Sequence, residues 1–203
     1  MSIDHRGKHV VVRRIRTFLL ALCVAGAAAC EPVTPRGSGG TDGSARWALG
    51  AAQPWLTAFA ADAQLREILG SGIALDGRLG ANTGAWSFVV YSASRGEILR
   101  VTVDSAGKAS STRGAAAAPG PGIARPLPDG WVDSIAVLEV VRPHLSYGAT
   151  SVGIAVLNVA DYGGEIAGQA AWGLSFDRGP NQIVLWNGKY AGVQSSLQAF
   201  AAP

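Results

Sequence analysis

Two stretches of this 203-residue sequence decide its fold: AWSFVVYSASRGEILRVTVDSAGKAS (85–110) and AWGLSFDRGPNQIVLWNGKYAGVQS (171–195). In each, apolar side chains alternate with polar ones on both sides of a polar turn, a pattern typical of antiparallel strands. Each then reaches a Gly-Lys turn, Gly107-Lys108 or Gly188-Lys189, where glycine supplies an unusual backbone angle. The sequence therefore predicts two β-hairpins, which pair 85–92 with 97–104 and 171–177 with 182–187.

A helical pattern precedes each hairpin. The first predicted helix covers 54–69, because Pro54 suits a first turn and Gly70 a stop, with apolar residues near helical spacing between them: Trp55, Phe59, Leu65, Ile68 and Leu69. The second covers 133–142, where Asp133 can serve as the cap and Pro143 as the end. Further strands are expected at 73–79 and 152–156. The sequence thus predicts an α+β fold of two diverged repeats, each a helix followed by antiparallel strands.

The second helical pattern carries a resemblance. LPDGWVDSIAVLEVV (127–141), followed by a W-x-L-x-F strand, resembles the PepSY-like, cystatin-like modules of bacterial envelope proteins. Their W-D-S-x-x-A-L element corresponds here to Trp131, Asp133, Ser134, Ala136 and Leu138. The resemblance covers 127–193 best and 54–110 more faintly. It implies a helix packed across a curved antiparallel sheet and a role in binding or inhibition, and it transfers no active-site residues.

The N-terminus has the parts of an export signal. A basic run ends at Arg16, and the apolar stretch 17–29 is too short for a bilayer core that needs roughly 20 residues. Ala27-Ala28-Ala29-Cys30 resembles the lipobox of bacterial lipoproteins, although Ala27 stands where leucine is usual. We expect a signal peptide at 1–29 and a lipid on Cys30 that anchors the chain to a membrane on the extracytoplasmic side. The alternative is ordinary cleavage that leaves Cys30 as a free thiol.

The rest of the chain divides at two irregular segments. Residues 30–45 are rich in Gly, Pro, Ser and Thr and predict a flexible tether. A second such segment at 114–130 predicts a linker between repeats at 46–113 and 131–203. Five of the 17 Lys and Arg and one of the 14 Asp and Glu precede Cys30, so the remainder is near neutral and no nucleic acid partner is expected.

The polar inventory lacks the common catalytic sets. After processing, His144 is the one histidine, so a catalytic triad would have to join it to Ser134 or Ser146 and to Asp133. A zinc site lacks ligands, and Asp161 with Glu165 lacks the calcium-loop spacing. Neither Gly-Lys turn has the spacing of a phosphate loop. No cofactor, metal or catalytic residue is predicted.

Six tryptophans are many for this length. Trp86 and Trp172 are in phase with the other apolar strand residues and are expected in the core, whereas Trp47 and Trp186 are less certain and could serve a ligand face.

Two functions stay open. The first is a non-catalytic, lipid-anchored cell-envelope protein that binds a protein or peptide along an exposed strand edge, unless the tether or 114–130 covers that edge. The alternative is a carboxylate-dependent hydrolase of envelope polymers, which would need two facing carboxylates from the scattered Asp and Glu.

Overall fold

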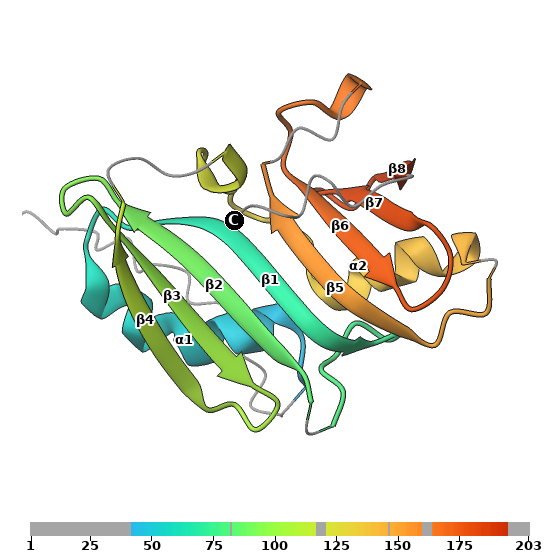
Figure 1. The fold of residues 1–203 in the computed structure, drawn as a ribbon, viewed down its shortest axis with the longest axis horizontal. Coiled ribbons are helices and arrows are strands. Elements are labelled where there is room, and N and C mark those ends of the chain that lie inside the picture. Colours follow the sequence, from blue (N-terminus) through green and yellow to red (C-terminus); the bar gives the residue numbers. More distant parts are fainter. Residues whose placement is uncertain (1–41, 82, 117–120, 146, 160–163, 195–203) are drawn as a thin grey trace, which may run out of the picture. The chain divides into compact units, whose positions relative to one another are not determined.

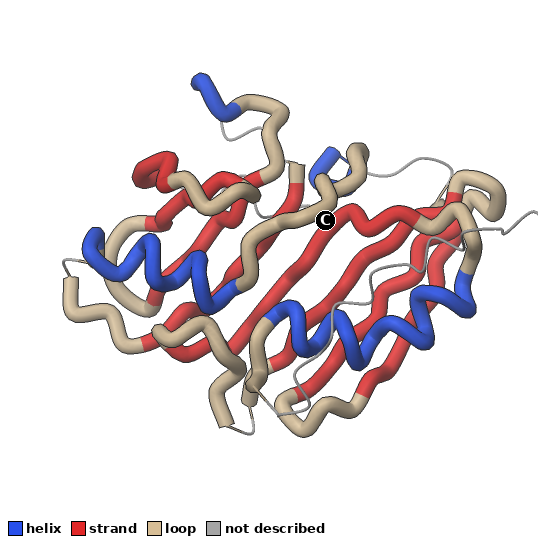
Figure 2. The backbone as a smooth tube through the Cα atoms, turned by 180° about the vertical axis from the view of Figure 1, so that it is seen from behind, coloured by secondary structure: helices blue, strands red, loops and turns tan. Residues whose placement is uncertain are grey.

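The computed structural model describes residues 42–81, 83–116, 121–145, 147–159 and 164–194. The predicted α+β class is confirmed: these residues form two α-helices and one continuous eight-stranded sheet in which all neighbouring strands are antiparallel. The strand order is β4-β3-β2-β1-β5-β6-β7-β8, and both helices lie on the same face of the sheet (Figures 1 and 2). Among the described residues, none of the helices is both long and apolar enough to cross a membrane.

The element bounds follow the chain in order. The first half has α1 (Ala45–Phe59), β1 (Gln64–Ala74), β2 (Ala85–Ser92), β3 (Glu97–Asp104) and β4 (Ala109–Ala115). The second half has α2 (Ser134–Val141), β5 (Ser151–Asn158), β6 (Ala171–Phe176), β7 (Asn181–Leu185) and β8 (Tyr190–Gln194). Three 3-10 turns lie between them: η1 (Pro121–Ile123), η2 (Arg142–His144) and η3 (Gly164–Ile166).

Both predicted hairpins are confirmed. β2 pairs with β3 from Ala85–Asp104 to Ser92–Glu97, and β6 pairs with β7 from Ala171–Leu185 onward. The two Gly-Lys turns also match one another. Gly107 (φ 80°) donates its N–H to the Asp104 carbonyl, and Gly188 (φ 87°) donates to the Leu185 carbonyl, so each glycine closes a hairpin in the left-handed conformation that disfavours other residues.

The predicted helix 54–69 is wrong, because two different elements share that segment. Helix α1 ends at Phe59, and Gln64–Ala74 form β1, which pairs with β2 on one side and β5 on the other. The apolar spacing fits a helix, but burial in β1 alternates, with Ile68 fully buried and Leu69 only partly. Pairing at the centre of the sheet therefore overrides the local pattern. Of the strand predicted at 73–79, Ile73 and Ala74 are the last residues of β1, and Leu79 forms one isolated bridge with Ile73.

Helix α1 begins earlier than the sequence indicates. Pro54 lies inside it rather than in its first turn. Proline removes the hydrogen bond to residue 50, and both Gly50 and Pro54 are exposed, so water can satisfy the Gly50 carbonyl. Ser44 caps the helix and Ala45 is fully buried. The predicted tether 30–45 therefore overlaps the packed body at its last residues.

The N-termini of the two helices meet. The Asp133 carboxylate accepts hydrogen bonds from the Ser134 N–H (2.8 Å) and from the Arg46 N–H of α1 (3.0 Å). The Ser134 hydroxyl accepts from the Ala45 N–H (3.0 Å) and donates to the Gly77 carbonyl (2.7 Å). Two side chains at the start of α2 therefore satisfy helix-terminal amides that α1 cannot satisfy itself. Asp133 is the cap of α2, as predicted.

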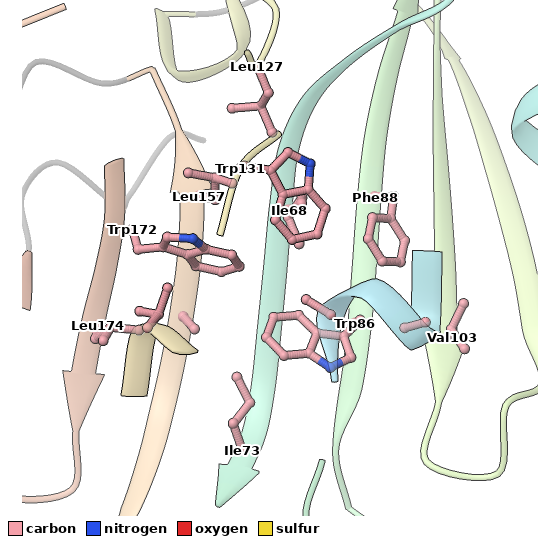
Figure 3. Close-up of a cluster of buried hydrophobic side chains, with 14 of the residues drawn as sticks. Ile68, Ile73, Trp86, Phe88, Val103, Leu127, Trp131, Leu157, Trp172 and Leu174 are labelled. Carbon is pink, nitrogen blue, oxygen red and sulfur yellow. The ribbon is translucent and has the colours of Figure 1, made fainter. Parts of the chain in front are cut away.

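Tryptophans fill the core between the helices and the sheet (Figure 3). Trp86 of β2 and Trp172 of β6 are fully buried, and their rings meet edge to face with centroids 6.2 Å apart. Trp131 packs against Trp172 in the same way at 6.1 Å. Each strand indole donates to the carbonyl just before a helix cap: Trp86 to Gly43 (3.0 Å) and Trp172 to Val132 (3.0 Å). The core placement predicted for Trp86 and Trp172 is confirmed.

The predicted linker 114–130 is partly structured. Its first residues, Gly114 and Ala115, end β4, and Pro121–Ile123 form η1. Leu127 is buried and donates its N–H to the Leu65 carbonyl of β1 (2.8 Å). This part of the segment is therefore fixed to β1. The two halves join as one sheet through the pairing of β1 with β5.

Candidate functional site

Strand β4 forms one edge of the sheet and pairs only with β3 among the described strands. Its sequence, ASSTRGA, has no bulky apolar side chain, and Thr112–Ala115 are exposed. The backbone N–H and carbonyl groups on the outer side of such an edge strand need hydrogen bonds from water or from a partner.

The backbone groups that face outward from β4 follow from its pairing with β3. The Lys108 carbonyl accepts from the Asp104 N–H at one end, and the Ala116 N–H donates to the Gly96 carbonyl at the other. Because bonded and non-bonded pairs alternate in an antiparallel ladder, the even-numbered residues of β4 bond to β3. The N–H and carbonyl groups of the odd-numbered residues point to the free edge: Ala109, Ser111, Arg113 and Ala115. This row of donors and acceptors has the geometry that an added strand requires.

The opposite edge differs. Strand β8 has five residues, its register with β7 shifts between Ile183 and Val184, and Gly192 has φ 120°. Tyr190 is held in place by stacking on His144 (ring centroids 3.8 Å apart) and by donating to Gln182 Oε1 (2.6 Å). A short strand with a bulge does not offer a continuous row of backbone groups. We therefore take β4 as the candidate site.

The structure does not bring the triad candidates together. Ser134 starts α2 and its hydroxyl is engaged with Gly77 and Ala45, whereas His144 lies in η2 beyond the other end of that helix. Ten helical residues span about 15 Å, far beyond hydrogen-bond reach. Asp133 is engaged in capping. Ser146 and Asp161 lie outside the described residues, as does Cys30.

Metal and phosphate candidates are equally dispersed. Glu165 is exposed in η3, and its carbonyl accepts from the Gln169 amide. Within the described ranges, no group of three or more His, Cys, Asp or Glu side chains is placed to hold a metal ion. Lys108 and Lys189 follow the two left-handed glycines in hairpin turns, as expected for turns rather than phosphate loops.

The Glu67 side chain is 16% exposed. Burial raises the pKa of Glu67, against the opposing effects of Arg100 and of a hydrogen bond from Asn158. Arg100 Nη2 lies 3.9 Å from Glu67 Oε1. Its neighbours are thus a cation and an amide, whereas glycoside hydrolysis needs a second carboxyl group about 5 to 9 Å away.

Two shallow hollows adjoin on the helix side of the sheet, of about 420 and 370 Å³, and they share Ala63 and Leu65. Asp129 is the one carboxylate among their lining residues. These two hollows do not supply the paired carboxylates that the alternative hydrolase function requires. A third hollow, of about 520 Å³, is lined by Asp42 and Asp76, of which Asp42 accepts from the Ser44 N–H (2.9 Å) and Asp76 lies 3.5 Å from Arg78 Nε.

Two exposed aspartates clamp the sheet ends. Asp62, before β1, accepts from the Ser92 hydroxyl (2.7 Å) and the Ser94 N–H (2.8 Å) after β2. Asp177, after β6, accepts from the Thr150 hydroxyl (2.7 Å) and N–H (2.9 Å) before β5. These hydrogen bonds lower the pKa of each carboxyl to about 2. Both carboxylates therefore hold neighbouring strand ends together through these hydrogen bonds.

Of the remaining tryptophans, Trp47 and Trp186 are partly buried against the core, whereas Trp55 is 45% exposed. The sequence analysis does not predict strand β4. Its one sequence signal is the Gly107-Lys108 turn, which returns the chain beside β3.

Comparison with protein-family models, curated proteins and solved structures finds no match to this chain. The structure therefore establishes the α+β fold with its eight-stranded antiparallel sheet, and the resemblance to PepSY-like modules stays a prediction.

Proposed function

We propose that this protein is a non-catalytic component of the bacterial cell envelope, lipid-anchored through Cys30, that binds an extended segment of a protein or peptide along β4. The observation that carries the binding proposal is the seven-residue β4 edge with its outward row of backbone groups and its exposed Thr112–Ala115. Adding a strand there needs no special side-chain motif, since main-chain hydrogen bonds supply the affinity.

The envelope location rests on the sequence. The basic run, the apolar stretch and Cys30 together have the order of a lipoprotein signal. Replacing Cys30 with Ser should release the protein from the membrane fraction, because the acyl chains supply the anchor. Mass spectrometry of the N-terminal peptide should show the acyl groups on the natural protein, and an unacylated, fully soluble natural protein would contradict the anchor.

We also propose that the two halves are diverged copies of one PepSY-like unit. Three features support this origin: a helix followed by four strands occurs twice in chain order, the Trp86 and Trp172 indoles bond equivalent carbonyls before the helix caps, and the two Gly-Lys turns close equivalent hairpins. Such a duplication accounts for a sheet whose centre is the antiparallel contact of β1 with β5.

Site-specific photocrosslinking in the native envelope tests the binding edge. A benzophenone amino acid at Thr112 of β4 should give a discrete adduct, whereas the same group at Val193 of β8 should not, although Val193 is 57% exposed. Both positions are exposed on edge strands, but their side chains lie on opposite faces of the sheet, since Thr112 pairs with Arg100 and Val193 pairs with Gln182. An adduct from Val193 alone, or from neither site, would contradict the β4 assignment.

A further inference from the structure

Helix α1 packs mainly over β3 and β2, and side chains near its two ends reach the two ends of β4. A methyl group added at Gly107, in the β3–β4 turn, would lie 3.1 Å from the Trp47 ring, near the start of the helix. At the other end, the Arg113 guanidinium of β4 lies 5.5 Å from the centroid of the Phe59 ring. Twelve helical residues span about 18 Å and six strand residues about 20 Å. The two contacts are therefore separated by similar distances along the helix and along the edge strand.

Trp55 lies on the flank of α1 that faces the β4 edge. Residues Ala48, Ala52 and Phe59 are fully buried toward the sheet. Leu49 and Leu56 line a hollow with Val90 and Leu65, so their flank faces the centre of the sheet. A helical residue advances about 100° per position, which places Trp47, Ala51 and Trp55 on the opposite flank.

The position of Trp55 along the length of β4 follows from the rise per residue of the helix and of the strand. Trp55 lies about 12 Å beyond Trp47 along the helix, and Ser111 lies about 13 Å beyond Gly107 along the strand. The exposed indole is therefore level with Ser111, whose own N–H and carbonyl face the free edge. An added strand would place the residue opposite Ser111 on the helix side of the sheet, because directly paired residues share a face and Ser111 pairs with the buried Val101.

We propose that Trp55 is the specificity-determining residue of this edge, and that the partner is an extended segment of alternating apolar and polar residues with a bulky apolar side chain opposite Ser111. This inference rests on the proposed strand addition at β4. Tryptophan is among the residue types that are enriched where a few side chains dominate the binding energy of an interface. In the complex, the bulky apolar side chain of the partner covers the Trp55 indole. The partner's polar side chains point to the other face of the sheet, toward water.

A second copy of this chain fits the edge less well. The side chains that β4 would present to Trp55 of a partner copy are small or charged: Ala109, Ser111, Arg113 and Ala115. They would leave the indole uncovered. Size complementarity therefore favours a different, apolar segment over self-association.

Calorimetric titration with two peptides tests the proposal. Both have nine residues between terminal lysines, and they alternate threonine with isoleucine or threonine with alanine. The full chain should bind the isoleucine peptide more tightly. Trp55→Ala should weaken that binding on the order of tenfold, Trp55→Phe should retain most of it, and Thr57→Ala, on the same helix, should leave it unchanged. Circular dichroism should report native structure for each variant.

Ser111→Pro separates the two proposals, because it removes an outward N–H without breaking a β3 bond, whereas Ser111→Ala keeps that N–H. Loss of both peptides in Ser111→Pro, with Trp55→Ala unchanged from the natural chain, would overturn the role of Trp55 and leave the edge. No peptide binding, or binding insensitive to Ser111→Pro, would overturn both. A dimer that Ser111→Pro dissociates would make a second copy the occupant and overturn the proposed partner.

Discussion

The half of the sheet built from β1 to β4 and the half built from β5 to β8 share two interior features but differ in their outer strands. In both, a buried indole bonds the carbonyl before a helix cap, and a left-handed glycine closes the last hairpin. Yet α1 has 15 residues and α2 has eight, and β4 is regular where β8 is bulged. The comparison teaches that the interior sets the fold, whereas the edges are where the halves can take different functions.

The largest expected effect concerns the paired indoles. Trp86→Ala and Trp172→Ala should each lower the free energy of unfolding by about 3 to 5 kcal/mol, since each empties a fully buried site. Trp172→Ala should cost more, because that ring makes edge contacts with both Trp86 and Trp131. Urea unfolding followed by circular dichroism measures both. A loss at Trp172 well below that at Trp86 would break the equivalence of the halves.

The helix caps should show a smaller and unequal effect. Asp133 accepts amide hydrogen bonds at the starts of both helices, whereas Ser44 accepts only from Trp47 of its own helix (3.2 Å). Asp133→Ala should therefore cost about 2 kcal/mol and Ser44→Ala about 1 kcal/mol in urea unfolding. Asp133→Asn keeps an acceptor and serves as the control. Equal losses at the two caps would show that Asp133 does not join the halves.

The two turn glycines should respond alike. Gly107→Ala and Gly188→Ala each force a left-handed residue, and the added methyl group meets Trp47 at 3.1 Å or Val132 at 3.3 Å. Each should lower stability by about 1 to 2 kcal/mol. Ser105→Ala, in the same turn as Gly107, is the matched control. A tolerated change at one glycine only would show that the two hairpins are not equivalent.

The smallest expected effect at neutral pH belongs to the aspartate clamps. Their pKa of about 2 in the folded protein lies below the ordinary 3.8. Their stabilisation is therefore present above about pH 4 and is lost as the pH falls toward 2. Asp62→Asn and Asp177→Asn should each flatten the fall in urea midpoint between pH 4 and 2. The clamping carboxylate lies before β1 in one half and after β6 in the other. Similar pH dependence in the two variants would show that this difference in position does not affect how much the clamp stabilises the fold.

The sequence predicts what local patterns determine. Both hairpins and α2 follow from alternation, turn glycines and the Asp133 cap. The boundary between α1 and β1 does not, because Leu65, Ile68 and Leu69 fit a helix until β2 and β5 pair on either side of them. Strand β4 is not predictable from ASSTRGA, since its strand character comes from pairing with β3. The sequence predicts binding at an exposed strand edge but not that β4 is this edge, because the chemistry of the site lies in backbone groups.

The seam between β1 and β5 has a kinetic consequence. Within each meander, β1 to β4 and β5 to β8, the hairpins pair strands that are neighbours in sequence. The seam instead pairs Ile68 with Leu157, roughly 90 positions apart. Closing it costs about 2.5 kcal/mol more chain entropy than closing a turn of a few residues. The two meanders can therefore form before the seam. Substitutions confined to the seam should then leave the refolding rate nearly unchanged and accelerate unfolding, so the lifetime of the folded protein depends on its central strands.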